Sequence, residues 1–356
     1  MEYSGEIVAE ASPGLARRAY PLIRSLLQLA LAAGLLAAFL VRVDLVEVRH
    51  QLGKADLVWL PLAFAANIAS DWFRAIRWQH LLLPLRRMGV PFLFAAALVG
   101  VAGNLILPLR AGEVVRVQIV RRRSGLGVSS IVATLLAEKL MDVVAFSTFI
   151  VVGLLLIEEA AFLWPLGVAY GVLVVAGLIA ARYLAKRAER QSAPPADAGG
   201  GRLRAWFGRE LHSFASGLQS FRNPAALFHI TWSAHVAWFC DAAMYYAFGR
   251  ALGLDLSLGA YLLVVVAATL AVSVPITQAG LGVFHLAVAG LLVALGVDEA
   301  LAAAYAIFAH LFFALPYIVS APLAAFVLRL SLSDIFFLRM PQGVREERPA
   351  DEAAAL

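Results

Sequence analysis

The fold of this chain is decided by two short stretches, NLILPLRAGE at residues 104–113 and VSVPITQAG at residues 272–280. In each stretch a proline interrupts an apolar run, and a helix is expected to resume at an Ala-Gly pair. Irregular backbone at membrane depth leaves N–H and C=O groups unsatisfied unless protein surrounds it or it lines a wet cavity. A pair of broken helices in corresponding places of two halves points to a transporter's binding site.

Composition places both breaks in a membrane protein. The chain has 356 residues, of which 62% are apolar and 15% charged, and its mean hydropathy is +0.82. A water-soluble domain of this length would not have this composition. Apolar stretches long enough to span hydrocarbon lie at about 22–41, 57–78, 129–157, 161–182, 225–249 and 299–328. Two others, 91–107 and 257–275, run into the proline breaks. The predicted fold class is an all-α polytopic membrane protein.

The first apolar stretch is expected to be a retained helix. Arg17, Arg18 and Arg24 precede it or lie at its start, as in a signal peptide. The stretch is long, however, and no small-x-small cleavage site directly follows it, which makes a cleaved signal peptide the less favoured alternative.

Basic residues predict the topology. Of the 29 Lys and Arg residues, all but five fall in segments that can share one side of the membrane; the exceptions are Arg42, Arg49, Lys54, Lys139 and Arg250. The positive-inside rule makes that side cytoplasmic, with both termini there. The bias holds only if 91–123 enters from the cytoplasm and returns to it. By the same alternation 257–296 dips in from outside, which gives six full transmembrane helices and two re-entrant helical hairpins.

The two halves then match as an inverted-topology repeat. Each half has a span, a broken hairpin and a second span, at about 57–157 and 225–328. The predicted organisation is a cytoplasmic N-terminal segment at 1–20, one transmembrane domain at 21–330 with a cytoplasmic linker at about 186–205, and a partly disordered cytoplasmic tail at 331–356. Residues 206–218 are expected to form an amphipathic helix on the cytoplasmic surface.

Several classes of function are excluded or disfavoured. Cys240 is the only cysteine, so disulfides and thiolate metal sites are excluded. The histidines have no i,i+4 or His-x-Glu spacing, which disfavours a metal site. No nucleophile motif, P-loop or dinucleotide fingerprint occurs, so neither catalysis nor a cofactor is expected. Positive-inside sorting accounts for the basic residues without nucleic acid.

The first charged cluster is Arg110, Glu113 and Arg116, beside the first break. An ionisable residue at membrane depth costs about 2.5–3.5 kcal/mol on insertion scales and is a functional candidate. Glu113 and Arg116 can pair on a helix starting near Gly112, whose N-terminal N–H groups suit an anion such as phosphate. The alternative is that these charges only neutralise one another and fix the hairpin.

The second cluster, Glu138, Lys139 and Asp142, is predicted near the membrane midplane. Glu138 and Asp142 lie four residues apart and share a helix face. They suit a cationic headgroup or a proton, or Lys139 neutralises Asp142. Asp241 is a further candidate.

Other polar residues in the apolar runs are expected to be structural. Asp71, Arg74 and Arg77 are placed near the cytoplasmic interface, where snorkelling accounts for them as well as a headgroup contact does. Most tryptophans are assigned to the interfacial belt, namely Trp59, Trp72, Trp78, Trp164, Trp232 and Trp238.

Four motifs together give the chain a family likeness: RAIRW at 74–78, PLRAGEVVR at 108–116, EKLMD at 138–142 and PITQAGLG at 275–282. In order and spacing they resemble the lysylphosphatidylglycerol synthase transmembrane, or flippase-like, family over nearly all of residues 20–330. The resemblance implies movement of an aminoacylated phospholipid between leaflets, or a role in hopanoid or glycolipid pathways. The soluble aminoacyl-transferase domain of two-part members is not in this sequence, so transport without synthesis is expected. The second break adds Thr277, Gly280, Gly282 and His285 to the candidate headgroup cavity.

The chain departs from the family pattern at three places. Lys139 stands where arginine is usual, Gln278-Ala279 replaces Pro-Gly, and His285 replaces a glutamate. Histidine has an ordinary pKa of about 6.5, so its charge can change near neutral pH. If His285 contacts a headgroup, transport of an anionic lipid is expected to rise as pH falls. The alternative is a neutral hydrogen-bonding residue.

The leading hypothesis is a lipid translocase in which the two hairpin tips meet near the midplane and enclose a polar cavity. Glu113, Glu138 and Asp142 would meet positive charge, while Arg110 and Arg116 would meet phosphate. The competing hypotheses are an accessory or scaffold subunit for a separately encoded lipid-modifying enzyme, and a small-solute or proton-coupled transporter. Membrane lipids are the expected partners.

Overall fold

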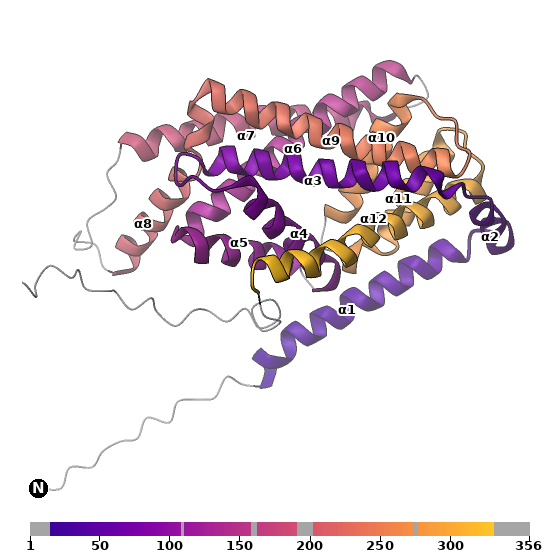
Figure 1. Ribbon diagram of the computed structural model, residues 1–356, viewed down its shortest axis with the longest axis horizontal. Helices are drawn as coiled ribbons and strands as arrows, with labels where there is room; N and C mark the ends of the chain where they lie inside the picture. The colour runs from indigo at the N-terminus through magenta and orange to yellow at the C-terminus, as the bar shows by residue number, and fades with distance from the viewer. Residues whose placement is uncertain (1–14, 108–109, 158–161, 191–201, 274–276, 331–356) are drawn as a thin grey trace, which may run out of the picture.

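The structure is a computed structural model that describes residues 15–107, 110–157, 162–190, 202–273 and 277–330. Within these residues the chain is helical and contains no strand. The long helices run roughly along the longest axis of the molecule (Figure 1). The predicted all-α class is therefore confirmed.

Eight of the described helices overlap the predicted apolar stretches, and α5 and α11 form the second arms of the predicted hairpins, whereas α2 was not predicted. They are α1 Leu15–Leu40, α2 Leu45–Gly53, α3 Leu60–Leu82, α4 Val90–Ile106, α5 Ala111–Ser124, α6 Val128–Leu156, α7 Trp164–Arg190, α8 Arg202–Ser216, α9 Pro224–Ala251, α10 Leu258–Ser273, α11 Val283–Ala294 and α12 Glu299–Val327. Short 3-10 turns occur at η1 Leu57–Trp59, η4 Gln219–Arg222 and η5 Gln278–Gly280. The predicted amphipathic helix at 206–218 falls on α8 and the two-residue turn that follows it.

Three helices, α6, α7 and α12, are long and apolar enough to cross a membrane. The end of α1 and α2, which meet at 87°, make a fourth candidate if they count as one bent span. With 23 and 28 residues, α3 and α9 are about 34 and 42 Å long at 1.5 Å per residue. They reach the length of a span but carry charged residues, so the count of six spans stays a prediction.

The antiparallel pair α3 and α9 forms the centre of the molecule (Figure 1). Small residues allow the close approach, because Ala63 and Ala75 on α3 and Ala234 and Ala237 on α9 are fully buried. At one end the Ser220 hydroxyl donates to the carbonyl oxygens of His80 and Leu81, at 3.1 and 3.0 Å. Hydrogen bonding therefore fixes the register where the loop before α9 meets the end of α3.

The first predicted break is present as a hairpin of α4 and α5. The two helices pack closely because Gly112 faces Gly103, where an added Cβ would lie 2.8 Å from the Gly112 Cα. At the base of the hairpin Arg86 donates to the carbonyl oxygen of Ser124 at 2.6 Å. The start of α4 and the end of α5 therefore lie at the same end of the molecule. Pro108 and Leu109 fall outside the described residues.

The second predicted break separates α10 from α11, and residues 274–276 within it fall outside the described residues. The chain resumes through η5, where Ala279 has φ 53° and Gly280 φ 76°. His310 on α12 lies 3.1 Å from the Ala279 carbonyl oxygen and holds this turn. The order of helix, broken hairpin and helix thus occurs twice, in α3 to α6 and in α9 to α12. How the hairpins sit in a membrane stays a prediction.

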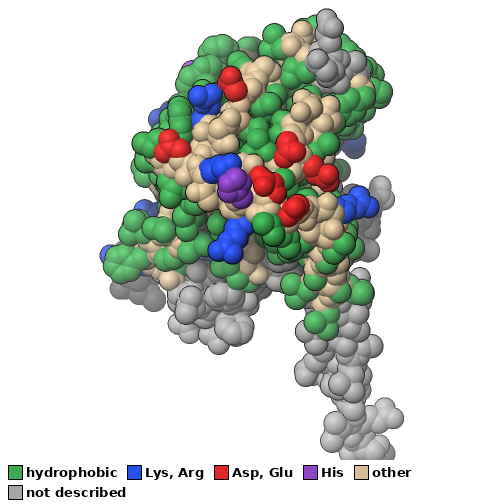
Figure 2. All heavy atoms as spheres, turned by 90° about the vertical axis from the view of Figure 1, so that its right-hand side faces the viewer, with side chains coloured by type: hydrophobic (Ala, Val, Ile, Leu, Met, Phe, Trp, Pro, Cys, Tyr) green, Lys and Arg blue, Asp and Glu red, His purple; other side chains and the backbone are tan. Residues whose placement is uncertain are grey.

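The two ends of the molecule differ in charge. Acidic side chains gather at the end that carries α2 (Figure 2). The exposed acidic residues of this end are Asp44, Asp56, Asp255, Asp298 and Glu299. The opposite end carries the α3–α4 loop and the last turn of α5, with arginines that include Arg86, Arg87, Arg121, Arg122 and Arg123. This asymmetry is the one from which the sequence predicts the topology.

Candidate functional site

A cavity of about 490 Å³ lies where the two broken hairpins meet. Residues of α1, α3, α4, α5, α6, α9, α10, η5 and α12 contribute to its lining. The two tips are in contact, because Arg110 donates a hydrogen bond to the carbonyl oxygen of Ser273 at 3.0 Å. Arg110 has φ 56°, a left-handed conformation that directs the chain into α5. The structure therefore brings the tips together as the sequence predicts.

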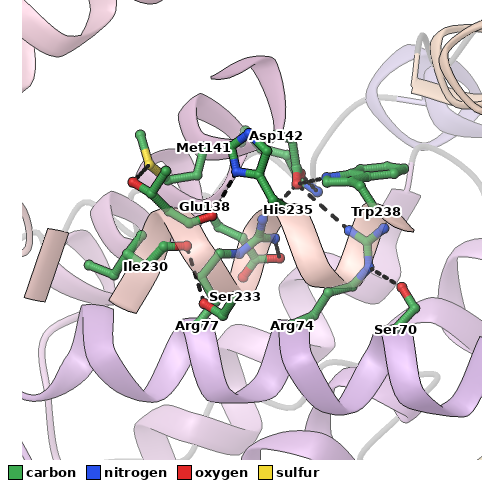
Figure 3. A network of polar contacts seen from close by, with 12 residues as sticks. Ser70, Arg74, Arg77, Glu138, Met141, Asp142, Ile230, Ser233, His235 and Trp238 are labelled. Atoms are coloured by element: carbon green, nitrogen blue, oxygen red, sulfur yellow. Dashed lines mark hydrogen bonds and ion pairs between the residues drawn. The ribbon is translucent and has the colours of Figure 1, made fainter. Parts of the chain in front are cut away.

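Beside the cavity lies a buried ionic network centred on Glu138 (Figure 3). Arg77 lies 3.2 Å from Glu138 Oε1 and donates to Asp142 Oδ1 at 2.8 Å. Arg116 donates to both Glu138 oxygens, at 3.3 and 2.8 Å. Arg77 is fully buried, and both carboxylates are nearly so. One carboxylate thus lies between two guanidinium groups, which offsets the cost of burying each charge.

A second part of the network joins α3 to α9. Arg74 donates to Asp241 at 2.5 Å, lies 3.7 Å from Asp142 and stacks over the ring of Trp238 at 4.1 Å. The Trp238 indole N–H donates to Asp142 at 2.9 Å. A planar guanidinium suits this combination of ion pairing and ring stacking, which an ammonium group does not reproduce.

Other charged groups are only loosely paired. Glu113 lies 3.8 Å from Arg116 with its side chain 31% exposed, and Lys139 lies 3.4 Å from Asp142 with its side chain 49% exposed. Around the cavity four buried polar atoms have no hydrogen-bond partner, namely Asp71 Oδ2, Asn104 Oδ1, Glu113 Oε2 and Thr277 Oγ1. Buried polar atoms are normally satisfied, so these atoms are suited to bind a ligand.

Nine of the predicted headgroup-cavity residues line this cavity, and their binding of a headgroup stays a prediction. Those lining the cavity are Arg110, Glu113, Arg116, Glu138, Lys139, Asp142, Asp241, Thr277 and Gly280. In the first cluster the predicted Glu113–Arg116 pair is the weaker contact, because Arg116 turns to Glu138. In the second cluster Lys139 approaches Asp142 as expected for neutralisation, but Arg77 binds Asp142 more closely. Binding of a cationic headgroup or a proton by these carboxylates stays a prediction.

Three predicted cavity residues do not line the cavity. Gly112 packs against α4, where an added Cβ would come within 2.6 Å of the Asn104 nitrogen. Gly282 packs in the same way against Leu35 and Leu36 of α1. His285 lies behind the second tip, with ring centroids 5.3 Å from Phe39 and 4.8 Å from His310. Helix packing accounts for Gly112 and Gly282, while His285 is buried away from the cavity lining with its Nδ1 atom unpartnered. A headgroup contact by His285 stays a prediction.

The structure contradicts snorkelling as the explanation of Arg77. Arg77 cannot snorkel, because its side chain is enclosed between α3, α6 and α9. Trp78 and Trp238 likewise belong to the core and not to an interfacial belt. Position near the end of an apolar run does not say which helix face a residue occupies, and here that face is turned toward neighbouring helices.

Several cavity residues were not selected from the sequence. Asp71 and Arg74 line it from α3, His310 and Tyr317 from α12, and Asn104 from α4. A signal was present for the first two, since charged residues occupy similar places in the leading helices of both halves. Within the described residues, no group of three or more His, Cys, Asp or Glu side chains could hold a metal ion.

Two sequence comparisons relate this chain to known proteins. Residues 25–321 match the transmembrane region of lysylphosphatidylglycerol synthase. The chain belongs to this family. This membership confirms the resemblance found in the four motifs. A more distant relative is glycosyltransferase AglD of Haloferax volcanii, 26% identical over 343 residues, which cover 84% of this chain and 53% of AglD. The chain thus spans about half the length of that relative.

Proposed function

We propose that this protein is a membrane lipid translocase that moves a phospholipid or another polar-headed lipid between leaflets. The observation that carries the proposal is a cavity with charges of both signs at the meeting point of two broken hairpins. Its volume of about 490 Å³ lies in the range of about 300–1,000 Å³ that is typical of ligand sites. A headgroup fits such a space while the acyl chains stay in the bilayer.

The residues divide into a scaffold and a contact set. Arg77, Arg116 and Glu138 hold one another in place, which limits the cost of keeping charge inside a membrane. Lys139 and Glu113 are partly exposed and loosely paired, so their charges are available to a headgroup. In the proposed complex Lys139 and Arg110 meet phosphate, and Glu113 meets positive charge.

The topology that accompanies this proposal has six spans and two re-entrant hairpins, with both termini in the cytoplasm of a bacterial cell. In it the arginine-rich end of the molecule faces the cytoplasm and the acidic end faces outward. The protein itself acts as a carrier and not as an enzyme.

A translocation assay tests the proposal. Purified protein is reconstituted in phosphatidylethanolamine and phosphatidylglycerol vesicles that contain a fluorescent phospholipid, and a membrane-impermeant quencher reports the outer leaflet. Wild type is expected to move the probe, while Lys139→Ala and Glu113→Gln slow it about tenfold or more through lost headgroup contacts. Matched controls are Lys54→Ala and Glu299→Gln, whose side chains lie at the acidic end. Wild-type rates equal to those of protein-free vesicles would refute the proposal.

The relative named as a glycosyltransferase favours a second candidate, an accessory subunit for a separately encoded lipid-modifying or glycosyl-transfer enzyme. In that case alanine at Arg110 leaves lipid movement unaffected, and the protein co-purifies with the enzyme.

A further inference from the structure

Two buried oxygen atoms on α3, Asn67 Oδ1 and Asp71 Oδ2, have no hydrogen-bond partner. The two residues are four apart, so they lie one above the other on a single helix face. Asn67 is 2% exposed and Asp71 4%, while Asp71 also lines the cavity. One oxygen atom of each of these buried side chains is thus left without a donor.

Asp71 differs from the other buried carboxylates of the site. Glu138, Asp142 and Asp241 each have an arginine nitrogen within 2.8 Å. Within the described part of the chain, Asp71 has no ion pair. The arginine nearest in sequence, Arg74, lies one turn away on the same helix and turns to Asp241. Asp71 is therefore a buried acid whose neighbouring cation is already engaged.

The groups that act on Asp71 come from four helices. Arg74 belongs to α3, Asp241 to α9, Arg116 to α5 and Tyr317 to α12. Arg116 is held by Glu138, and the Asp241 carboxylate opposes a second negative charge. The Tyr317 hydroxyl accepts a hydrogen bond from Asn67 Nδ2 at 3.3 Å and is itself hydrogen-bonded to the Asp71 carboxyl group, whose Oδ2 atom stays without a partner. None of these groups donates to the free Oδ2.

We propose that Asp71 is a proton-binding site and that its proton is exchanged with the cavity. A proton bound at Oδ2 converts this acceptor into a donor, and Asn67 Oδ1 lies one turn away to receive it. Both unsatisfied atoms are then paired, which removes the cost of a buried carboxylate without a partner.

Loss of this proton also changes an ion pair between α3 and α9. This step rests on the proposed function. When cavity water takes the proton, the Asp71 O–H bond breaks and a carboxylate remains three residues from Arg74. Arg74 can then pair with Asp71 instead of Asp241, which loosens the link between α3 and α9. Lipid translocation is thereby coupled to a proton gradient.

Infrared spectroscopy tests the proton site without any measurement of lipid transport. Wild type in lipid vesicles at neutral pH is expected to show the carbonyl stretch of a buried carboxylic acid, with a shift in D2O. The band is expected to be lost in Asp71→Asn, whose amide can still donate to Asn67 and keep the protein folded. It is expected to persist in Asp298→Asn, where the side chain is exposed. Absence of the band from wild type, or its loss on addition of Na⁺, would overturn the proton site.

Vesicles with an imposed pH gradient test the coupling. Wild-type translocation of the fluorescent phospholipid is expected to change about fivefold or more when the gradient is reversed, and Asp71→Asn is expected to be insensitive. Translocation that ignores the gradient in wild type overturns the coupling but leaves the translocase intact. An infrared band in a protein that moves no lipid instead refutes the proposed function and retains the proton site.

Discussion

Glu138 is buried at the edge of the cavity between two guanidinium groups, with Arg116 at 2.8 Å and Arg77 at 3.2 Å. Each arginine has a further partner or contact, Arg77 on Asp142 and Arg116 over the ring of Trp78 at 3.7 Å. Glu138 therefore stabilises the site through these ion pairs and is also a candidate contact for a headgroup.

This arrangement predicts the effect of neutralising Glu138. Glu138→Gln keeps the shape of the side chain but leaves two buried cations without their shared counterion, so unfolding is expected to become easier by about 3–5 kcal/mol. Thermal unfolding in detergent measures the change, with Glu299→Gln on the exposed first turn of α12 as control.

A double variant tests whether an unpaired buried cation causes this loss of stability. Arg77 keeps its partner Asp142 in Glu138→Gln, whereas Arg116 loses its closest one. Adding Arg116→Met removes that cation, so it is expected to recover part of the lost stability. Glu138→Gln with unfolding equal to wild type would show that the buried pairs contribute nothing to the fold.

At the scale of the secondary-structure element, the broken hairpins are held by close packing between their helices. Gly112 begins α5 directly against α4, and an added Cβ would lie 2.6 and 2.8 Å from the backbone nitrogen and side-chain oxygen of Asn104. No side chain fits there without moving the first tip, which carries Arg110 into contact with the second.

Two glycine-to-alanine substitutions distinguish the effect of this packing on stability from the general destabilisation that glycine causes in a helix. Gly290 lies on α11 with nothing within 4 Å of a built Cβ, so Gly290→Ala is expected to stabilise the protein by about 1 kcal/mol. Gly112→Ala is expected to destabilise it and to reduce lipid movement, since the tip is displaced. Thermal unfolding and the vesicle assay measure both. Equal effects of the two substitutions would refute the packing argument.

On the scale of the whole molecule the charged ends define an orientation. In a background with Cys240→Ser, a cysteine replacing Arg121 is expected to react with impermeant reagents only from the cytoplasmic side. One replacing Asp298 is expected to react only from outside, because basic loops remain in the cytoplasm. Labelling of position 121 from outside would mean that α4 and α5 cross the membrane as a plain span.

The sequence by itself determined the helical class, the extent of the helices and the two breaks. These features depend on local hydropathy, on proline and on glycine, all of which act over a few residues. Most of the charged cavity residues could be selected for the same reason, since an ionisable group in an apolar run is conspicuous wherever the helix packs.

Only the tertiary structure decided which charges meet. Arg77 and Asp142 are 65 residues apart, and Arg74 and Asp241 are 167 apart. Their pairing depends on how α3, α6 and α9 are rotated against one another. The same rotation buries Arg77, places Asp71 at the cavity and turns His285 away from it. Helix rotation is set by the packing of many side chains at once, and no local pattern in the sequence encodes it.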